Sequence, residues 1–211
     1  GLIIQADVSR PENIRRMVKE VQAAFGSLDI FVSNAVGELF TYYRPPLDLT
    51  PEQWDKAVDS QAKAFLVGVQ EAARLMGKGG RIVAITYRPG GLTASWQPYI
   101  AQGSAKAALE SMVRYFAVAL AGRGITVNAI TPGITEDSIL DSLPKDVQDG
   151  IRAWHLAGWT PMRRLGTPAD TGNAVALLCS EEAGWITGQV IAVDGGASLM
   201  NPDFPLEIQR G

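Results

Sequence analysis

Five short apolar runs alternate with segments of helical periodicity along this chain, and no two of them are joined by a hairpin-type turn. The runs cover residues 2–5, 28–36, 81–86, 125–131 and 188–193. Antiparallel neighbours can be joined by two-residue turns, whereas parallel neighbours need a longer crossover, usually a helix. The pattern therefore predicts an α/β fold in which helices cover both faces of a parallel sheet.

The helices between these runs are predicted from the residues at their ends. Ser9 and Glu12 have the spacing of a capping box, which predicts a helix start ahead of apolar residues at helical spacing. The segment Thr50–Gln53 combines a cap residue, a proline in the first turn and a glutamine, so it is expected to begin a long helix. Two further helices are expected over residues 99–122 and 167–180.

Composition narrows the classes of function. With 211 residues and 46% hydrophobic content, the chain can form one globular domain over residues 1–211. The 19 basic and 22 acidic residues are scattered, so we expect no surface for nucleic acid or for an anionic membrane. A single cysteine, Cys179, and a single histidine, His155, leave no disulfide framework, no metal cluster and no obvious Ser-His-Asp triad. No apolar run could span a bilayer and no leader is recognised, so a cytoplasmic location is expected.

The segment Tyr99–Lys106, YIAQGSAK, carries the chemistry that the composition leaves open. At about 100° per residue, seven helical steps fall about 20° short of two turns, so Tyr99 and Lys106 share one stripe about 10 Å apart. A phenol can hydrogen-bond to an oxygen that gains charge, and a nearby cation stabilises that charge. The pair therefore suits reduction of a polarised double bond. The alternative is a surface or core tyrosine beside a lysine whose stem packs on the helix.

Several short motifs are spread over nearly the whole chain. They are Ala6-Asp7-Val8, Leu28-Asp29-Ile30 with Ser33-Asn34-Ala35, the lysine of AKAALE, Val127-Asn128-Ala129 with Pro132-Gly133, and Ile186-Thr187-Gly188-Gln189 with Asp194-Gly195-Gly196. In these residues and in their order, the chain resembles the short-chain dehydrogenase/reductase family, which binds nicotinamide cofactors on a Rossmann-type sheet. The resemblance implies a doubly wound parallel sheet and an NAD(P)H-dependent oxidoreductase.

The position of the tyrosine points to one subgroup of that family. The usual catalytic tyrosine lies four residues before the lysine, and here Gln102 occupies that position. Tyr99 instead lies seven residues before Lys106, which is similar to the Tyr-x6-Lys pattern of enoyl-acyl-carrier-protein reductases. The resemblance implies that Tyr99 binds the carbonyl of an enoyl thioester and that Lys106 binds the nicotinamide ribose. NADPH is the expected cofactor, with NADH as the alternative, and the acyl group is carried on acyl carrier protein or coenzyme A.

The resemblance also implies further contacts. Tyr87 stands where the wider family carries a serine or, in some enoyl reductases, a second tyrosine, so it is expected to line the substrate pocket; an aromatic plug at a strand end is the alternative. Residues 135–165 resemble the variable substrate lid, although helix packing explains the same apolar residues. Expected cofactor contacts are Asp7, Val8, Asn34, Ala35, Lys106, Pro132, Gly133, Ile134 and Thr135, and expected acyl contacts are Tyr87, Leu140, Trp154 and Trp159.

One part of the family pattern is not found in these residues. The strand, Gly-rich phosphate-binding turn and helix that open the family's fold are absent, and no G-x-x-x-G-x-G occurs. We therefore expect a Rossmann-type domain that lacks its N-terminal βαβ unit, and a strand at 2–5 that lacks its usual neighbour. The resemblance further implies a homotetramer assembled through the long helices and the last strand. A short-chain carbonyl reductase or alcohol dehydrogenase, and a catalytically silent scaffold, remain the alternative functions.

Overall fold

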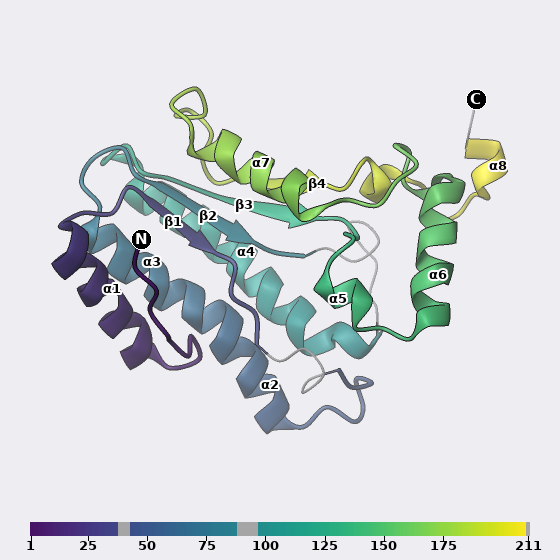
Figure 1. The fold of residues 1–211 in the computed structure, drawn as a ribbon, viewed down its shortest axis with the longest axis horizontal. Helices are drawn as coiled ribbons and strands as arrows, with labels where there is room; N and C mark the ends of the chain where they lie inside the picture. Colours follow the sequence, from purple (N-terminus) through teal and green to yellow (C-terminus); the bar gives the residue numbers. More distant parts are fainter. Residues whose placement is uncertain (38–42, 88–96, 210–211) are drawn as a thin grey trace.

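The computed structural model describes residues 1–37, 43–87 and 97–209. Its centre is a four-stranded sheet in the order β1-β2-β3-β4, and every pairing is parallel. Figure 1 shows the strands side by side, with their carboxyl ends all toward the same edge. The strands are β1 (Ile30–Ser33), β2 (Arg81–Ile85), β3 (Thr126–Pro132) and β4 (Val190–Val193). The predicted parallel α/β fold is confirmed, and so are four of the five predicted strands.

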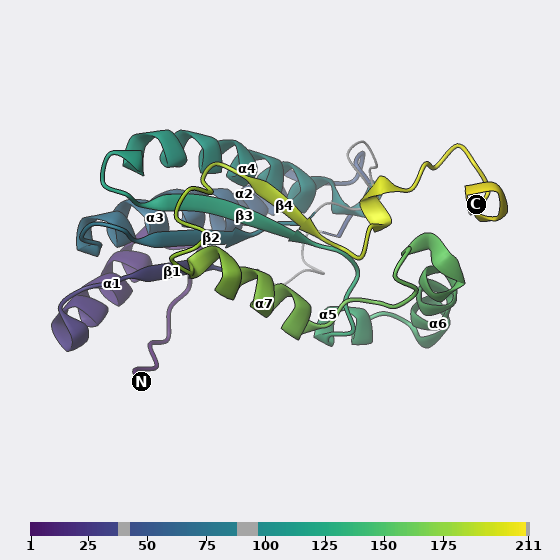
Figure 2. The ribbon, with the colours of Figure 1, turned by 90° about the horizontal axis from the view of Figure 1, so that it is seen from above.

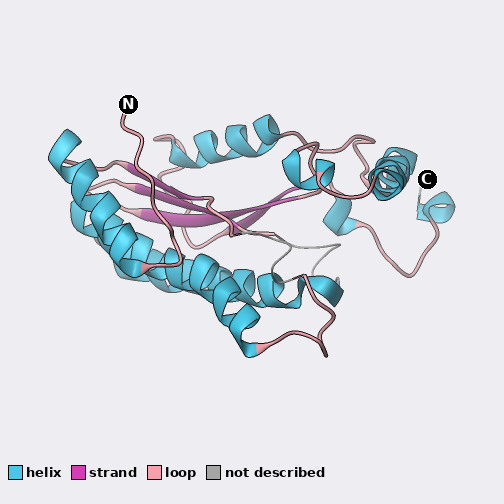
Figure 3. Ribbon diagram, turned by 60° about the horizontal axis from the view of Figure 1, so that its bottom comes forward, coloured by secondary structure: helices cyan, strands magenta, loops and turns pink. Residues whose placement is uncertain are grey.

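Helices form a layer on each side of this sheet (Figures 2 and 3). The helices and helical turns are α1 (Pro11–Phe25), α2 (Pro51–Val58), η2 (Asp59–Lys63), α3 (Ala64–Leu75), η3 (Gln97–Tyr99), α4 (Ile100–Ala121), α5 (Ser138–Asp141), α6 (Lys145–Trp154), η4 (His155–Trp159), α7 (Pro168–Cys179), η5 (Ala197–Leu199) and α8 (Leu206–Gln209). Helices α3 and α4 pack on one face of the sheet, and α1 packs against α3. Helix α7 packs on the other face of the sheet. Among the described residues, no helix combines the length and the apolarity that crossing a membrane requires.

The core follows from the alternation of side chains along the strands. Ile82 of β2 faces the α3–α4 layer, where it joins Phe65 and Leu109 in one fully buried cluster. The next residue, Val83, faces the opposite side and packs with Leu178 of α7. Both faces of β2 are therefore buried, which explains why the sequence of this strand is a continuous apolar run.

The predicted helix starts have different outcomes. Thr50 forms a capping box with Gln53 at the start of α2, and the helix continues through the π-helical turn η2 into α3. The predicted capping box of Ser9 is wrong, because Arg10 is the N-cap of α1 and its side chain makes no capping bond. Ser9 instead donates from its backbone N and its Oγ to Asp7 Oδ1, at 3.0 and 2.7 Å.

The predicted strand over residues 2–5 is also wrong. These residues have no strand conformation, and the sheet ends at β1 within the described part of the chain. A strand needs a neighbour for its backbone N–H and C=O groups, and none lies beside this segment among the described strands. The apolar side chains of Ile30 and Val32 on the edge strand β1 are accordingly 46% and 40% exposed.

Candidate functional site

The candidate site lies where the carboxyl ends of the four strands meet. In an open parallel sheet of this kind, ligands bind in the crevice beyond the carboxyl ends of the strands. Asn34 and Ala35 follow β1, and Tyr87 lies two residues after β2. The segment 132–135 begins with the last residue of β3. The topology therefore brings these predicted site residues to one edge of the sheet, the edge from which α5 and α6 continue in Figure 1.

Tyr99 ends the short helical turn η3 and is the N-cap residue of α4. Its side chain is 9% exposed. The ring meets Tyr87 edge to face with centroids 5.0 Å apart, and Tyr43 in the same way at 5.7 Å. Three phenols from distant parts of the chain are thus gathered around the start of α4. Sequence reasoning missed Tyr43, because no local pattern links residue 43 to residue 99.

Burial changes the acidity of these tyrosines. It raises the pKa of Tyr87 to about 12 and also raises the pKa of Tyr43, with a smaller contribution from Tyr87 nearby. Both phenols consequently keep their protons at neutral pH. They can act as hydrogen-bond donors, and neither is a ready base.

Lys106 is held at the end of β2. Its side chain is 7% exposed, and Nζ donates a hydrogen bond to the carbonyl oxygen of Ile85, the last residue of β2, at 2.7 Å. Burial lowers the pKa of Lys106 to about 8, and the carboxylate of Glu110 opposes that shift. Glu110 is itself held by Thr86, whose Oγ1 donates to Oε1 at 2.8 Å. The lysine therefore carries its charge at pH 7 in a fixed place beside the strand end.

Gln102 lies between these two residues on α4. It is three positions after Tyr99 and four before Lys106, so all three side chains share one face of the helix. Gln102 is 1% exposed, and neither amide atom has a hydrogen-bond partner in the described structure. Thr131, near the carboxyl end of β3, also has a buried hydroxyl without a partner among the described residues. Buried polar groups without a partner in the described structure thus lie on α4 and near the carboxyl end of β3.

The segment after β3 is fixed to the last strand. Gly133 N donates to the carbonyl of Val193 at 3.0 Å, and a Cβ at Gly133 would come within 2.8 Å of Asp194 Cβ. Only glycine therefore fits this turn. The turn therefore lies at the same edge of the sheet as Lys106 and as the buried polar groups of Gln102 and Thr131, which have no partner among the described residues.

The expected cofactor contacts after β1 and before α1 are more exposed. Asn34 and Ala35 are exposed after β1, and the carbonyl of Ala35 accepts a hydrogen bond from Gln61 Nε2 at 3.2 Å. Gln61 belongs to the π-helical turn η2 and is buried. Asp7 and Val8 lie in the turn before α1, where the hydroxyl and backbone N–H of Ser9 lower the pKa of Asp7.

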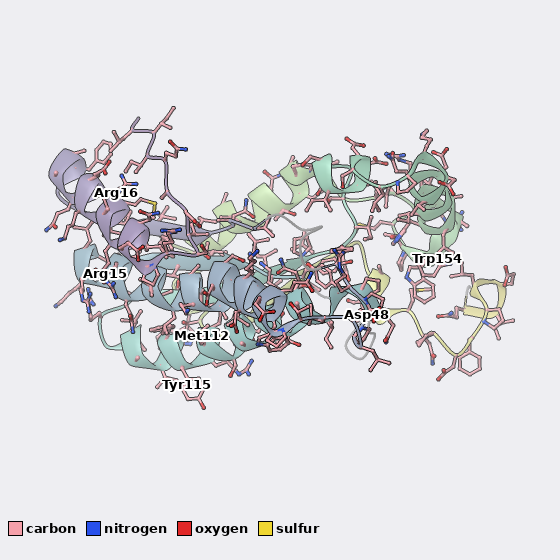
Figure 4. All side chains as sticks on the ribbon, turned by 90° about the horizontal axis from the view of Figure 1, so that it is seen from below. Arg15, Arg16, Asp48, Met112, Tyr115 and Trp154 are labelled. Carbon is pink, nitrogen blue, oxygen red and sulfur yellow. The ribbon has the colours of Figure 1, made fainter. Side chains whose placement is uncertain are left out.

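The predicted lid forms α5, α6 and the π-helical turn η4. Leu140 on α5 is 3% exposed, so it packs inside the protein. Trp154 at the end of α6 is 48% exposed and stacks on Trp159, with ring centroids 4.3 Å apart. Between them, His155 Nδ1 shares a hydrogen bond with Thr160 Oγ1 at 2.6 Å. Figure 4 shows Trp154 on the side of the molecule opposite α1.

Comparison with known proteins places the chain in a family. The profile of the family described as Enoyl-(Acyl carrier protein) reductase matches residues 1–198. The chain is 37% identical to 1-cyclohexenylcarbonyl-CoA reductase of Streptomyces collinus over 97% of the chain and 71% of that protein. It is 33% identical to 3-oxoacyl-[acyl-carrier-protein] reductase FabG of Staphylococcus epidermidis, over 92% of the chain and 76% of that protein.

Solved structures agree with this assignment. A short-chain dehydrogenase/reductase from Serratia marcescens superposes with a TM-score of 0.82 at 27% identity, over 93% of this chain and 76% of that one. The angucycline C-6 ketoreductase LanV with bound NADP superposes with a TM-score of 0.81 at 28% identity, over 94% of this chain and 76% of that one. The chain belongs to the short-chain dehydrogenase/reductase family, and its sheet is the Rossmann-type parallel sheet of NAD(P)H-dependent oxidoreductases.

Proposed function

We propose that this protein reduces the α,β double bond of an enoyl thioester with NADPH, NADH being the alternative cofactor. The observation that carries the proposal is the arrangement on α4, where Tyr99 and Lys106 are both buried on the face beside the strand ends. A buried amide, Gln102, occupies the position four residues before the lysine, and an amide is no proton donor of suitable acidity. The relative from Streptomyces collinus supports the proposal, since its name describes reduction of a conjugated enoyl thioester.

In this proposal each residue of the site has one task. When bound, a reduced nicotinamide supplies the hydride that the β carbon of the substrate accepts. Tyr99 donates a hydrogen bond to the thioester oxygen, which gains negative charge as the hydride adds to the β carbon and the electron pair of the double bond moves into an enolate. The α carbon of this enolate then takes a proton from water, which restores the C=O bond and gives the saturated thioester. Lys106 holds its ammonium group near the same place and binds the ribose hydroxyls. Tyr87 lines the substrate side, and its high pKa keeps it a donor.

The remaining proposed contacts surround this centre. Pro132, Gly133, Ile134 and Thr135 hold the carboxamide side of the ring, because the turn is anchored to β4 through Gly133 N. Asn34, Ala35, Asp7 and Val8 hold the adenosine half. Trp154 and Trp159 in the lid at about 135–165 contact the acyl chain from the end of α6 and from η4, and Leu140 contacts it from the buried side of α5. Coenzyme A and acyl carrier protein both present such an acyl chain as a thioester.

Carbonyl reduction is the second candidate function. FabG of Staphylococcus epidermidis, by its name a 3-oxoacyl reductase, is 33% identical to the chain. The ring contact between Tyr87 and Tyr99, with centroids 5.0 Å apart, supports this candidate, because either phenol is a hydrogen-bond donor of the kind that a ketone oxygen accepts. A catalytically silent scaffold is the third candidate, and it predicts no turnover of either substrate.

One comparison of substrates separates these functions. Purified protein is mixed with NADPH, or with NADH, and with either crotonyl-CoA or acetoacetyl-CoA, and loss of the reduced cofactor is followed. The enoyl proposal predicts the higher kcat/KM for crotonyl-CoA. A higher kcat/KM for acetoacetyl-CoA supports the carbonyl reductase, and no turnover of either substrate by protein that binds cofactor supports the scaffold.

We also propose that the protein is a cytoplasmic homotetramer assembled through α2–α3, α4 and β4. Support comes from the outer face of α4, where Tyr115 is 76% exposed and Val118 is 82% exposed. Figure 4 shows Tyr115 projecting from the helix away from the rest of the chain. Such apolar exposure is typical of interfaces between subunits. Light scattering after gel filtration measures the oligomeric state, and a monomer at micromolar concentration would contradict the proposed tetramer.

A further inference from the structure

The amide of Gln102 has no structural task in the described chain. A buried polar group without a partner destabilises a protein, and such groups are rare in native structures. Here both ends of one side chain, Nε2 and Oε1, are buried without a partner in the described structure, on a residue that is 1% exposed. An apolar side chain of the same length would fill the space without that loss of stability.

The location of Gln102 indicates what the amide is for. Lys106 Nζ bonds the last residue of β2, so α4 passes the end of that strand at Lys106. Residues one turn earlier on the same face therefore lie beyond the strand end, on the side of the crevice. Tyr99, which precedes Gln102 on this face, contacts Tyr87 there. Gln102 is thus placed between the phenol and the ammonium that serve the reaction.

We infer that Gln102 is a second hydrogen-bond donor to the substrate oxygen that gains negative charge, acting beside Tyr99. This inference rests on the proposed function for the identity of the substrate, an enoyl thioester. A thioester oxygen is an acceptor only, so it takes the Nε2 hydrogen. A fixed amide donor in a site closed to water is most effective when the oxygen carries charge, because its dipole needs no reorganisation.

The test uses an apolar replacement and a matched control. Gln102→Met keeps the length of the side chain and removes both polar atoms. Thr126→Val removes another buried hydroxyl that has no partner in the described part of the chain, at the amino end of β3 and so at the opposite edge of the sheet. Both variants are expected to raise the Tm of the free protein by about 2–4 °C. Only Gln102→Met should lower kcat with crotonyl-CoA, by about 10²-fold, and Thr126→Val should keep the wild-type value.

A second variant separates the donor from the acceptor. Gln102→Glu keeps an acceptor oxygen at the same place and, when ionised, loses the donor. We expect its kcat at pH 7 to be at least as low as that of Gln102→Met. Wild-type kcat in both Gln102→Met and Gln102→Glu, with both folds confirmed by circular dichroism, would contradict the assignment of a donor.

Ligand binding provides a readout that is independent of turnover. Titration calorimetry with butyryl-CoA, a saturated thioester with the same carbonyl, should show affinity about tenfold weaker in Gln102→Met than in wild type. Equal affinity and equal kcat, in a variant with a higher Tm, would mean that the amide is only a structural defect and would overturn the inference. A lower Tm would also overturn it, because the amide would then be paired in the free protein.

The outcomes distinguish this inference from the proposed function. If wild type reduces acetoacetyl-CoA and leaves crotonyl-CoA unchanged, the enoyl proposal fails, and the same variants are compared on acetoacetyl-CoA. A loss of about 10²-fold there in Gln102→Met supports the donor role for a ketone oxygen. No loss on the substrate that wild type does reduce overturns the inference.

Discussion

Replacing Lys106 by methionine should remove a pH dependence of stability that the wild type owes to one buried ammonium. The side chain is 7% exposed, and burial lowers its pKa from 10.5 to about 8. A change of this size corresponds to about 3 kcal/mol between the two protonation states. Because the group is almost fully buried, solvent screening reduces this figure little.

The sign follows from proton binding. Between pH 8 and pH 10.5 the unfolded chain holds this proton and the native protein does not, so the free energy of unfolding rises with pH in this window. Below about pH 8 the native protein carries the buried charge, and the loss of stability is present in full. Relative to Lys106→Met, wild type should therefore gain about 3 kcal/mol in unfolding free energy between about pH 7 and pH 11.

Urea unfolding followed by circular dichroism at several pH values measures this difference. Subtracting the variant from the wild type cancels the titration of every other group that the substitution does not touch. Lys78→Met replaces an exposed lysine and serves as the control for the loss of one lysine charge at the surface. Parallel curves for wild type and Lys106→Met would refute the reasoning, because Lys106 would then titrate as it does in the unfolded chain.

Three further predictions concern the cofactor and the fold. The affinity for NADPH, measured by calorimetry, should fall as pH rises above about 8, where Lys106 loses its charge; a flat profile would argue against its role. Gly133→Ala should lower the free energy of unfolding by about 1–3 kcal/mol, because its Cβ would lie 2.8 Å from Asp194 Cβ, and an unchanged urea midpoint would contradict this contact. Thr50→Ala should lower the free energy of unfolding by about 1 kcal/mol through loss of the capping box. Ser9 caps no helix, so Ser9→Ala should change this free energy less.

Local patterns predicted the parts of the fold that local physics determines. The strand β2 was predicted from a continuous apolar run, and it is buried on both faces by helices from two layers. The start of α2 was predicted from Thr50 and Gln53, whose mutual hydrogen bonds depend only on residues three apart. In such cases the sequence neighbourhood contains the interaction that decides the structure.

Predictions failed where the local structure depends on a distant residue, or where a side chain forms a different local hydrogen bond from the one predicted. Residues 2–5 have a strand-like sequence, yet a strand depends on a neighbour that the described sheet does not provide. Ser9 has the spacing of a cap, but its hydroxyl bonds Asp7 two residues earlier. The contact between Tyr43 and Tyr99 spans 56 positions and left no signal in either segment. The unpartnered amide of Gln102 could be recognised only once its surroundings were known.

The most direct test of the account is the initial rate of NADPH oxidation with crotonyl-CoA in Tyr99→Phe, compared with Tyr87→Phe as a matched loss of one phenol hydroxyl. If Tyr99 is the donor to the thioester oxygen, Tyr99→Phe lowers kcat by about 10²-fold and Tyr87→Phe lowers it much less, while both variants keep the wild-type circular dichroism spectrum. Wild-type kcat in Tyr99→Phe, or the larger loss in Tyr87→Phe, would contradict the account.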